Sequence, residues 1–170
     1  MEAIKRRLDK VEQHSSNLPL TCWCKVVPIK VLCFIWMVAQ GRIPSATTLQ
    51  SCNMNIERTV CGTCIGEFEC ADHILMRCSY VRLIMNMIFE WCGINIKEFY
   101  DVGEVLHFVA SWGRCPKKRI KLLCIYYNLL WNLWRIRNDR LFRGLSTIIC
   151  RCTDNIKVLP YLWLKCRVMV

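Results

Sequence analysis

Three cysteines and one histidine have the residue types and the spacing to bind a metal ion. They are Cys61, Cys64, His73 and Cys78, in the pattern C-x2-C-x8-H-x4-C. Two cysteines separated by two residues can direct their thiolates at one ion from a tight turn, which Gly62 would permit. Three sulfur ligands and one imidazole nitrogen make a closed tetrahedral Zn²⁺ site that leaves no position for water. The sequence therefore predicts one structural Zn²⁺, not a catalytic one.

A chain with 14 cysteines contains C-x2-C readily by chance, so the pair alone is a weak signal. The further histidine and cysteine lie close by, in the polar stretch of an otherwise apolar chain, and they favour the zinc site. Glu67, Glu69 and Asp72 lie among the ligands. We expect these carboxylates to be solvated or to accept hydrogen bonds from the ligands, and not to bind the ion themselves.

Two further pairs of cysteines have the spacing C-x-C, namely Cys22/Cys24 and Cys150/Cys152. They would form a second metal site only if the fold brought them together, and nothing in the sequence does so. The other cysteines are expected to be small core side chains or incidental ones: Cys33, Cys52, Cys92, Cys115, Cys124 and Cys166.

The composition is that of a chain with a hydrophobic core. Hydrophobic residues make up 54% and charged residues 22%, which excludes a disordered or collagen-like protein. The longest apolar run, at 31–39, is well short of the ~20 residues that span a bilayer. The start of the chain shows no secretory signal pattern. We therefore expect an intracellular protein, in the nucleus or the cytoplasm, with no membrane partner.

Hydrophobic periodicity and helix-ending residues predict a series of helices. Their expected ranges are 2–14, 29–40, 45–49, 81–92 and 116–143, with a metal-organised loop that contains short elements at 52–80. The helix at 29–40, which ends at Gly41, is almost wholly apolar and is expected to be buried on all sides. In the helix at 81–92, one side carries the expected core residues Leu83, Ile84, Met87, Ile88 and Trp91.

The longest predicted helix has Pro116 at its start and Gly144 just past its end, as helices commonly do. At roughly 100° per residue, one stripe contains Ile120, Leu123, Cys124, Tyr127, Leu130, Trp131, Trp134, Leu141 and Phe142. Trp131 and Trp134 are therefore expected to pack in the core, while the alternative is that they stack on exposed bases together with Tyr126 and Tyr127. Asn138 falls in the same stripe, so its amide needs a hydrogen-bonding partner if it is buried.

These elements predict a mainly α fold, a small helical domain organised around one structural zinc site. The expected parts are an N-terminal extension (1–19), a zinc-binding domain (20–92), a linker (93–115) and a basic helical C-terminal segment (116–170). Within the last part, the tail at 148–170 is interrupted by Pro160 and has no clear pattern.

The net charge of +11 comes almost entirely from the last third of the chain. Residues 114–170 carry 13 Lys and Arg against 2 Asp and Glu. Lys117, Lys118, Arg119 and Lys121 begin the longest helix, where cations oppose the helix dipole at a cost of about 0.3–1 kcal/mol each. This placement makes them candidate nucleic-acid-binding residues that contact phosphates, while the alternative is a solvated helix start.

Several ordered blocks resemble the zinc-binding domain that follows the polymerase in reverse transcriptases of plant LINE-type, non-LTR retroelements. The blocks are Trp23, Val27-Pro28-Ile29-Lys30, Phe34-Ile35-Trp36, Gly41-Arg42-Ile43-Pro44 and Leu49, then Cys61, Cys64, Glu69, His73-Ile74-Leu75 and Cys78, then Leu130-Trp131-Asn132-Leu133-Trp134, Arg137-Asn138 and Phe142. Two positions depart from the family pattern, because Cys70 replaces a small hydroxyl residue and Met85 replaces a tryptophan. The resemblance covers residues ~20–145 and implies a parent polyprotein with polymerase and ribonuclease H domains as partners.

The residues of those two enzymes are absent from this sequence. There is no Tyr-x-Asp-Asp turn of a polymerase, and no ribonuclease H set of four carboxylates follows Arg137-Asn138. We therefore expect a free-standing, non-catalytic fragment and not an enzyme. Its expected function is to bind nucleic acid, RNA or DNA, through the basic C-terminal third. The alternative is a structural spacer or protein-interaction module, a decayed retroelement fragment with no activity of its own.

Overall fold

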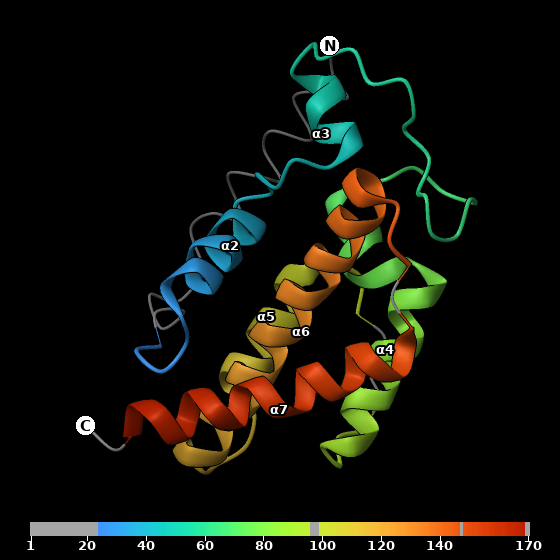
Figure 1. Cartoon of the computed structure of the whole chain (residues 1–170). Coiled ribbons are helices and arrows are strands. Elements are labelled where there is room, and N and C mark those ends of the chain that lie inside the picture. Colours follow the sequence, from blue (N-terminus) through green and yellow to red (C-terminus); the bar gives the residue numbers. More distant parts are fainter. Residues whose placement is uncertain (1–23, 96–98, 147, 169–170) are drawn as a thin grey trace.

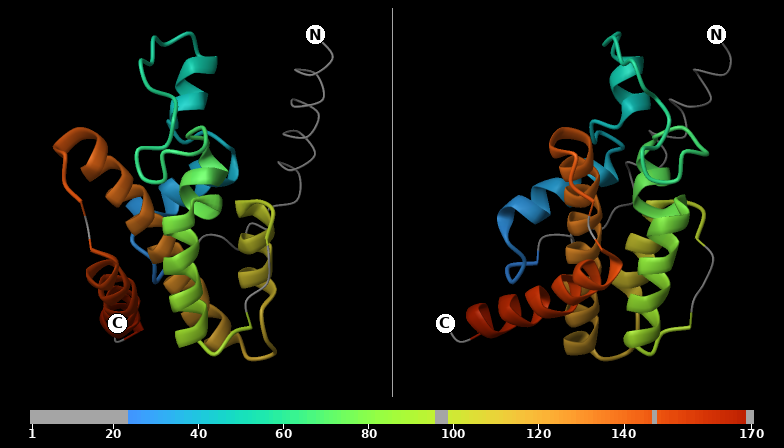
Figure 2. Two further views of the ribbon diagram at one scale, coloured as in Figure 1. Left: turned by 90° about the vertical axis from the view of Figure 1, so that its right-hand side faces the viewer. Right: turned by 45° about the vertical axis from the view of Figure 1, so that its right-hand side comes forward.

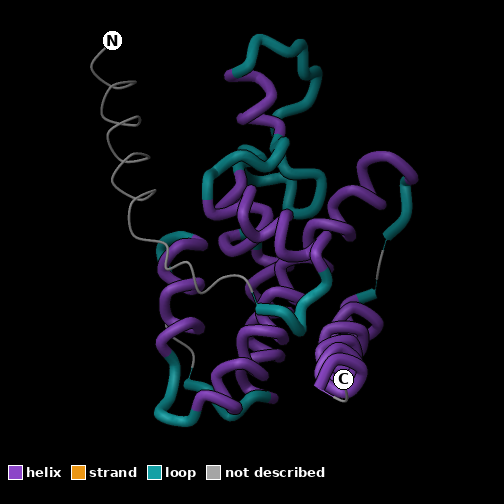
Figure 3. Tube along the Cα trace, turned by 90° about the vertical axis from the view of Figure 1, so that its left-hand side faces the viewer, coloured by secondary structure: helices purple, strands orange, loops and turns teal. Residues whose placement is uncertain are grey.

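The computed structural model describes residues 24–95, 99–146 and 148–168 and is mainly helical in these parts. Figures 1 and 3 show helices joined by loops, with no strand in the described part of the chain. The helices are α2 (Ile29–Ala39), α3 (Ala46–Ser51), the π-helical turn η2 (His73–Arg77), α4 (Ser79–Trp91), α5 (Val102–Ser111), α6 (Pro116–Arg143) and α7 (Ile149–Val168). The predicted helix at 2–14 lies outside the described residues. None of the helices described is long and apolar enough to cross a membrane.

The long helix α6 is the centre of the molecule and packs against α2, α5, η2 and α7. Figure 2 shows α2, α4, α5 and α7 grouped around it, with α3 apart from this group. Residues 126–130 are all buried, so the middle of α6 is covered on every side. The predicted stripe is therefore too narrow in the middle of the helix. It is also wrong at the ends, since Ile120, Leu141 and Phe142 are exposed.

Local signals in the sequence set both ends of α6 as predicted and the end of α2 within one residue, whereas α3 and α4 differ from their predicted ranges by one or two residues at each end. Pro116 is the first residue of α6, and Gly144 follows its end with φ +63°. Gly41 follows α2 with φ +62°, a left-handed conformation that favours glycine. The Ser45 side chain accepts a hydrogen bond from the backbone N–H of Thr48 and caps α3.

The buried faces of α2 and α4 differ from the prediction. In α4 the core residues are Val81, Ile84, Met85, Ile88 and Phe89, whereas Leu83, Met87 and Trp91 are exposed. Helix α2 is not buried on all sides, because Ile29 is 62% and Trp36 49% exposed. The apolar side chains of both helices are thus more numerous than the core can cover.

The predicted linker at 93–115 contains a helix that sequence periodicity did not reveal. This helix, α5, packs on α6 and buries Val102, Val105, Leu106 and Val109. Its start is capped by Asp101, whose carboxylate accepts a hydrogen bond from the backbone N–H of Glu104 at 2.9 Å. The segment therefore belongs to the same hydrophobic core as the helices on either side of it.

Helix α7 continues through Pro160, where the sequence pattern indicated an interruption. A proline inside a helix leaves the carbonyl four residues earlier without its usual N–H partner, and here that carbonyl belongs to Ile156. The side-chain amide of Asn128, on α6, donates hydrogen bonds to the carbonyls of Ile156 (3.3 Å) and Asn155 (3.2 Å). Packing on α6 thus supplies the hydrogen bond that the proline removes.

Candidate metal centre

Cys61 and Cys64 lie in a short hairpin, residues 59–69, which we call the zinc hairpin. Its arms are joined by a backbone hydrogen bond from the N–H of Cys61 to the carbonyl of Glu67 at 2.8 Å. An isolated antiparallel bridge pairs Val60 with Phe68. The hairpin holds the two cysteines on its turn, as the C-x2-C spacing predicts.

The turn of the zinc hairpin depends on Ile65 rather than on Gly62. Ile65 has φ +57°, and its N–H donates to the carbonyl of Cys61 at 3.0 Å. Gly62 has no positive φ, so the expectation that its conformational freedom permits the turn is wrong. A β-branched residue is rare in the left-handed region and is strained there. Contacts elsewhere in the hairpin must therefore hold this conformation.

His73 and Cys78 come from the π-helical turn η2 and the residue that follows it. In an α-helix, residues five positions apart point about 140° apart and would not meet at one ion. Here the N–H of Cys78 donates to the carbonyl of His73 at 2.9 Å, which is the wider i to i+5 bond of a π turn. The wider turn brings both side chains to the same side of the segment.

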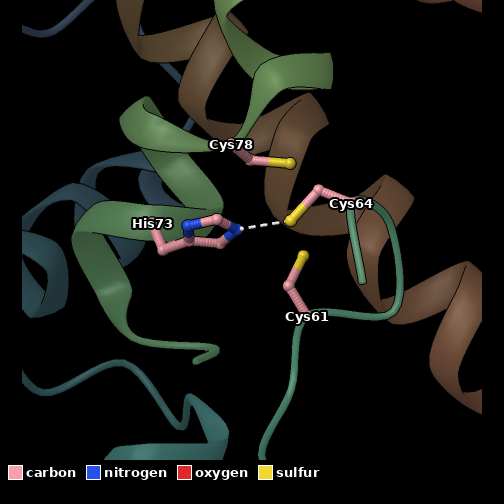
Figure 4. Close-up of side chains that lie close together, drawn as sticks. All are labelled: Cys61, Cys64, His73 and Cys78. Atoms are coloured by element: carbon pink, nitrogen blue, oxygen red, sulfur yellow. Dashed lines mark hydrogen bonds between the residues drawn. The ribbon is translucent and has the colours of Figure 1, made fainter. Parts of the chain in front are cut away.

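The four predicted ligands meet at one point (Figure 4), and their ligand atoms all lie within 4.8 Å of one another. The Sγ atom of Cys64 is 3.2 Å from Nε2 of His73. A tetrahedral zinc site with bonds of about 2.3 Å to sulfur has sulfur atoms about 3.8 Å apart, so the cluster has the right size. Cys61, His73 and Cys78 are at most 3% exposed, which places the site inside the core.

The imidazole of His73 is oriented for metal binding by Glu67. Oε2 of Glu67 lies 3.0 Å from Nδ1 of His73. A carboxylate can only accept a hydrogen bond, so Nδ1 carries the proton, and the lone pair of Nε2 faces the three sulfur atoms. The prediction that an acidic neighbour accepts a hydrogen bond from a ligand is therefore confirmed for Glu67.

The thiols of Cys61 and Cys78 interact across the centre of the site. A hydrogen bond from Cys78 lowers the pKa of Cys61 far below that of a free thiol, and the same bond raises the pKa of Cys78. A divalent cation that binds these sulfur atoms would displace the thiol protons. Three sulfurs and one imidazole fit Zn²⁺, with Cys61, Cys64, His73 and Cys78 as the ligands. When bound, the ion would join the zinc hairpin to η2 by four strong bonds.

Replacing Glu67 by alanine should weaken zinc binding about 10-fold to 100-fold, because the imidazole loses the partner that fixes its proton and its orientation. Competition with a chromophoric chelator measures this affinity. Asp72→Ala is the matched control, since it removes one negative charge next to His73 without changing a hydrogen bond to the ring. Equal affinities for the two variants would contradict this role of Glu67.

Glu69 is a structural residue and not a ligand. Its side chain is 9% exposed and forms an ion pair with the guanidinium of Arg137, on α6. Its Oε1 also accepts a hydrogen bond from the backbone N–H of Ala46 at 3.2 Å. One carboxylate therefore connects the zinc hairpin, the start of α3 and the end of α6. The sequence alone did not predict this pair, although both residues lie in the blocks that carry the family resemblance.

The structure places the predicted nucleic-acid-binding residues at the first turns of α6. Lys117, Lys118 and Lys121 are exposed. Arg119 instead donates hydrogen bonds to the carbonyls of Trp112 (3.3 Å) and Gly113 (2.9 Å), so it holds the connection from α5 to α6. Three of the four cations are thus available to a ligand.

The C-x-C pairs do not form a second metal cluster among the described residues, a part of the chain that excludes Cys22. A hydrogen bond from Cys124 lowers the pKa of Cys24 to about 6. Cys152 is buried, and burial raises its pKa to about 11. Cys24 is therefore associated with α6, and Cys152 is a core residue of α7.

Comparison with known proteins gives one finding. The family model described as zinc-binding in reverse transcriptase matches residues 5–84. No curated protein and no solved structure matches the chain. The matched segment contains all four residues of the cluster, whose donor set and geometry fit one zinc ion. Together, the family match and the cluster support a reverse transcriptase zinc-binding domain in this part of the chain.

Proposed function

We propose that this chain is a non-catalytic, zinc-stabilised module that binds nucleic acid through its phosphate backbone. The observation that carries the proposal is the exposed cluster of Lys117, Lys118 and Lys121 at the start of α6. Among the described residues, none of the three has an ion-pair partner. Cations at this end of a helix oppose its dipole. Phosphate groups of a nucleic acid would neutralise these charges and accept hydrogen bonds from them.

The role of zinc in this proposal is to stabilise the fold. Four protein ligands leave no open position at which the ion could activate water or polarise a substrate. The ion would keep the zinc hairpin and η2 in place against α6, and α6 carries the lysine cluster. Catalysis would belong to the polymerase and ribonuclease H domains of a parent polyprotein.

The proposal includes an origin in the reverse transcriptases of plant LINE-type, non-LTR retroelements. It is supported by contacts between blocks that carry the resemblance. The ring of Phe34 lies 5.4 Å from that of Trp131 and 5.9 Å from that of Trp134, measured between centroids. These contacts join α2, inside the segment that the family model matches, to α6, outside it.

Replacing Lys117, Lys118 and Lys121 together by glutamine should weaken binding and reduce its dependence on salt. The salt slope is the steepness with which the logarithm of the binding constant falls as the logarithm of the salt concentration rises. Each phosphate contact contributes about 0.9 to this slope on a duplex and about 0.7 on a single strand. The slope should therefore fall by up to about 2.7 on duplex DNA and about 2.1 on single-stranded RNA. A salt titration followed by fluorescence anisotropy measures both slopes. Arg119 is kept, because it holds the connection between α5 and α6.

The control is a variant with Arg42, Arg82 and Arg151 replaced by glutamine, which loses the same charge from exposed positions elsewhere. The parent slope should be retained in this variant. If both triple variants lose the same slope, binding depends on net charge and not on the lysine cluster. If neither changes, the lysines form a solvated helix start and the proposal is wrong.

A second candidate function is a structural spacer that docks on neighbouring domains. It is favoured by the exposed apolar side chains at the end of α6 and the start of α7, namely Leu141, Phe142, Leu145 and Ile148. A spacer would self-associate in isolation and would bind nucleic acid weakly, with no effect of the lysine substitutions.

A further inference from the structure

A cleft of about 740 Å³ lies between the zinc hairpin, α3 and the last turns of α6. Leu49 contributes from α3, Val60 and Thr63 from the hairpin, and Leu141 and Phe142 from α6. Thr63 lies between Cys61 and Cys64 in the sequence and accepts a hydrogen bond from the guanidinium of Arg140. One wall of the cleft is therefore the metal-binding turn itself.

The lining of the cleft combines apolar surface with arginine and amide groups. Arg58 is exposed at the cleft, Arg140 is half-buried, and Asn55 and Asn138 add amide groups. Of the two acidic residues there, Glu69 is neutralised by Arg137, which leaves only Glu57 with an exposed carboxylate. The lining thus carries three arginines, Arg58, Arg137 and Arg140, against two carboxylates, Glu57 and Glu69, which leaves a net charge of +1.

Phe142 is the flat apolar surface that this cleft offers to a ligand. Its side chain is 75% exposed, on the last turn of α6. Trp134 also lines the cleft, but its ring stacks on Phe34 and lies 5.0 Å from the guanidinium of Arg137. Only Phe142 thus has ring faces available to a planar group.

We infer that this cleft binds unpaired bases of a single-stranded nucleic acid, with one base stacked on Phe142 and adjacent phosphates on Arg58. The inference rests on the proposed function and adds a second site to it. Aromatic stacking combined with arginine and amide groups is how proteins bind exposed bases, whereas bases inside a duplex do not offer their faces. The volume of the cleft lies within the range of small-ligand sites. A cleft of this size holds a short stretch of nucleotides and not a duplex.

The test compares single strands with duplexes. Binding of an unstructured oligonucleotide of about 12 nucleotides, as RNA and as DNA, is measured by fluorescence anisotropy alongside the matching duplexes. Phe142→Ala should weaken single-strand binding about 5-fold to 150-fold, which corresponds to one lost base stack, and leave duplex binding unchanged. Arg58→Gln should reduce the single-strand salt slope by about 0.7. The comparison of the RNA with the DNA oligonucleotide shows whether the cleft prefers ribose or deoxyribose.

Two controls separate the cleft from the rest of the surface. Tyr161→Ala removes another exposed aromatic ring, on α7, and Arg82→Gln removes another exposed arginine, on α4. Both should bind as the parent does. If Phe142→Ala binds single strands as the parent does while the lysine triple variant loses affinity, the cleft inference is wrong and the proposed function stands. That result would favour a protein ligand for the cleft. If the parent binds no nucleic acid, both proposals fail.

Discussion

Removing the metal, by chelation or by Cys61→Ser, should unfold the zinc hairpin, η2 and α4 and destabilise α6. Structural zinc contributes about 10–16 kcal/mol in zinc-finger peptides, and a whole domain is stable by about 5–15 kcal/mol. Loss of the ion also exposes the hydrophobic core, because Cys61 and Cys78 are themselves core residues. The effect should extend beyond the zinc hairpin, η2 and α4, since η2 packs on α6 and α4 packs on α7.

Elemental analysis of protein purified without added metal should give one zinc per chain. Far-UV circular dichroism should then show loss of helix on chelation, and hydrogen exchange should show loss of protection in α6. Cys52→Ser is the matched control, because Cys52 is an exposed cysteine in the same part of the chain. It should keep both the zinc and the helical signal. A folded protein that contains no metal would overturn the zinc assignment.

The metal ligands were predictable from the sequence because their geometry is mostly local. The C-x2-C spacing fits one turn, and all four ligands fall within 18 consecutive residues. The π turn that aims His73 and Cys78 at one point was not predictable, because the pattern does not distinguish it from an α-helical turn. The left-handed conformation of Ile65 was not predictable either, because it is held by the rest of the hairpin.

The fold class and the helix ends were also predictable, but the buried faces were not. Helix α4 has two overlapping apolar stripes, one with Val81 and Met85 and the other with Leu83 and Met87. Both have helical spacing, so periodicity alone does not choose between them. The positions of η2 and α7, which pack against α4, decide which stripe is buried. The continuity of α7 depends in the same way on Asn128, a residue of another helix.

The largest effect of a residue outside the metal cluster is expected at Arg137. Arg137→Ala should lower the free energy of unfolding by about 3–5 kcal/mol, because Glu69 would keep a buried charge with no partner. The carboxylate would retain only its hydrogen bond from the N–H of Ala46. The zinc hairpin, α3 and α6 would then lose their common contact, although the four zinc ligands would be unchanged.

A second ion pair on the same helix provides the control for this prediction. Arg143 pairs with Asp139 at 3.2 Å, and the Arg143 side chain is 70% exposed. An exposed pair of this kind contributes about 0.3–0.5 kcal/mol, so Arg143→Ala should have little effect. Urea denaturation of the zinc-loaded variants measures both values. In the double variant with Glu69→Gln, Arg137→Ala should cost less than it does alone, because the unpaired charge is gone. Equal destabilisation by Arg137→Ala and Arg143→Ala would mean that the pair with Glu69 does not hold the zinc hairpin on α6.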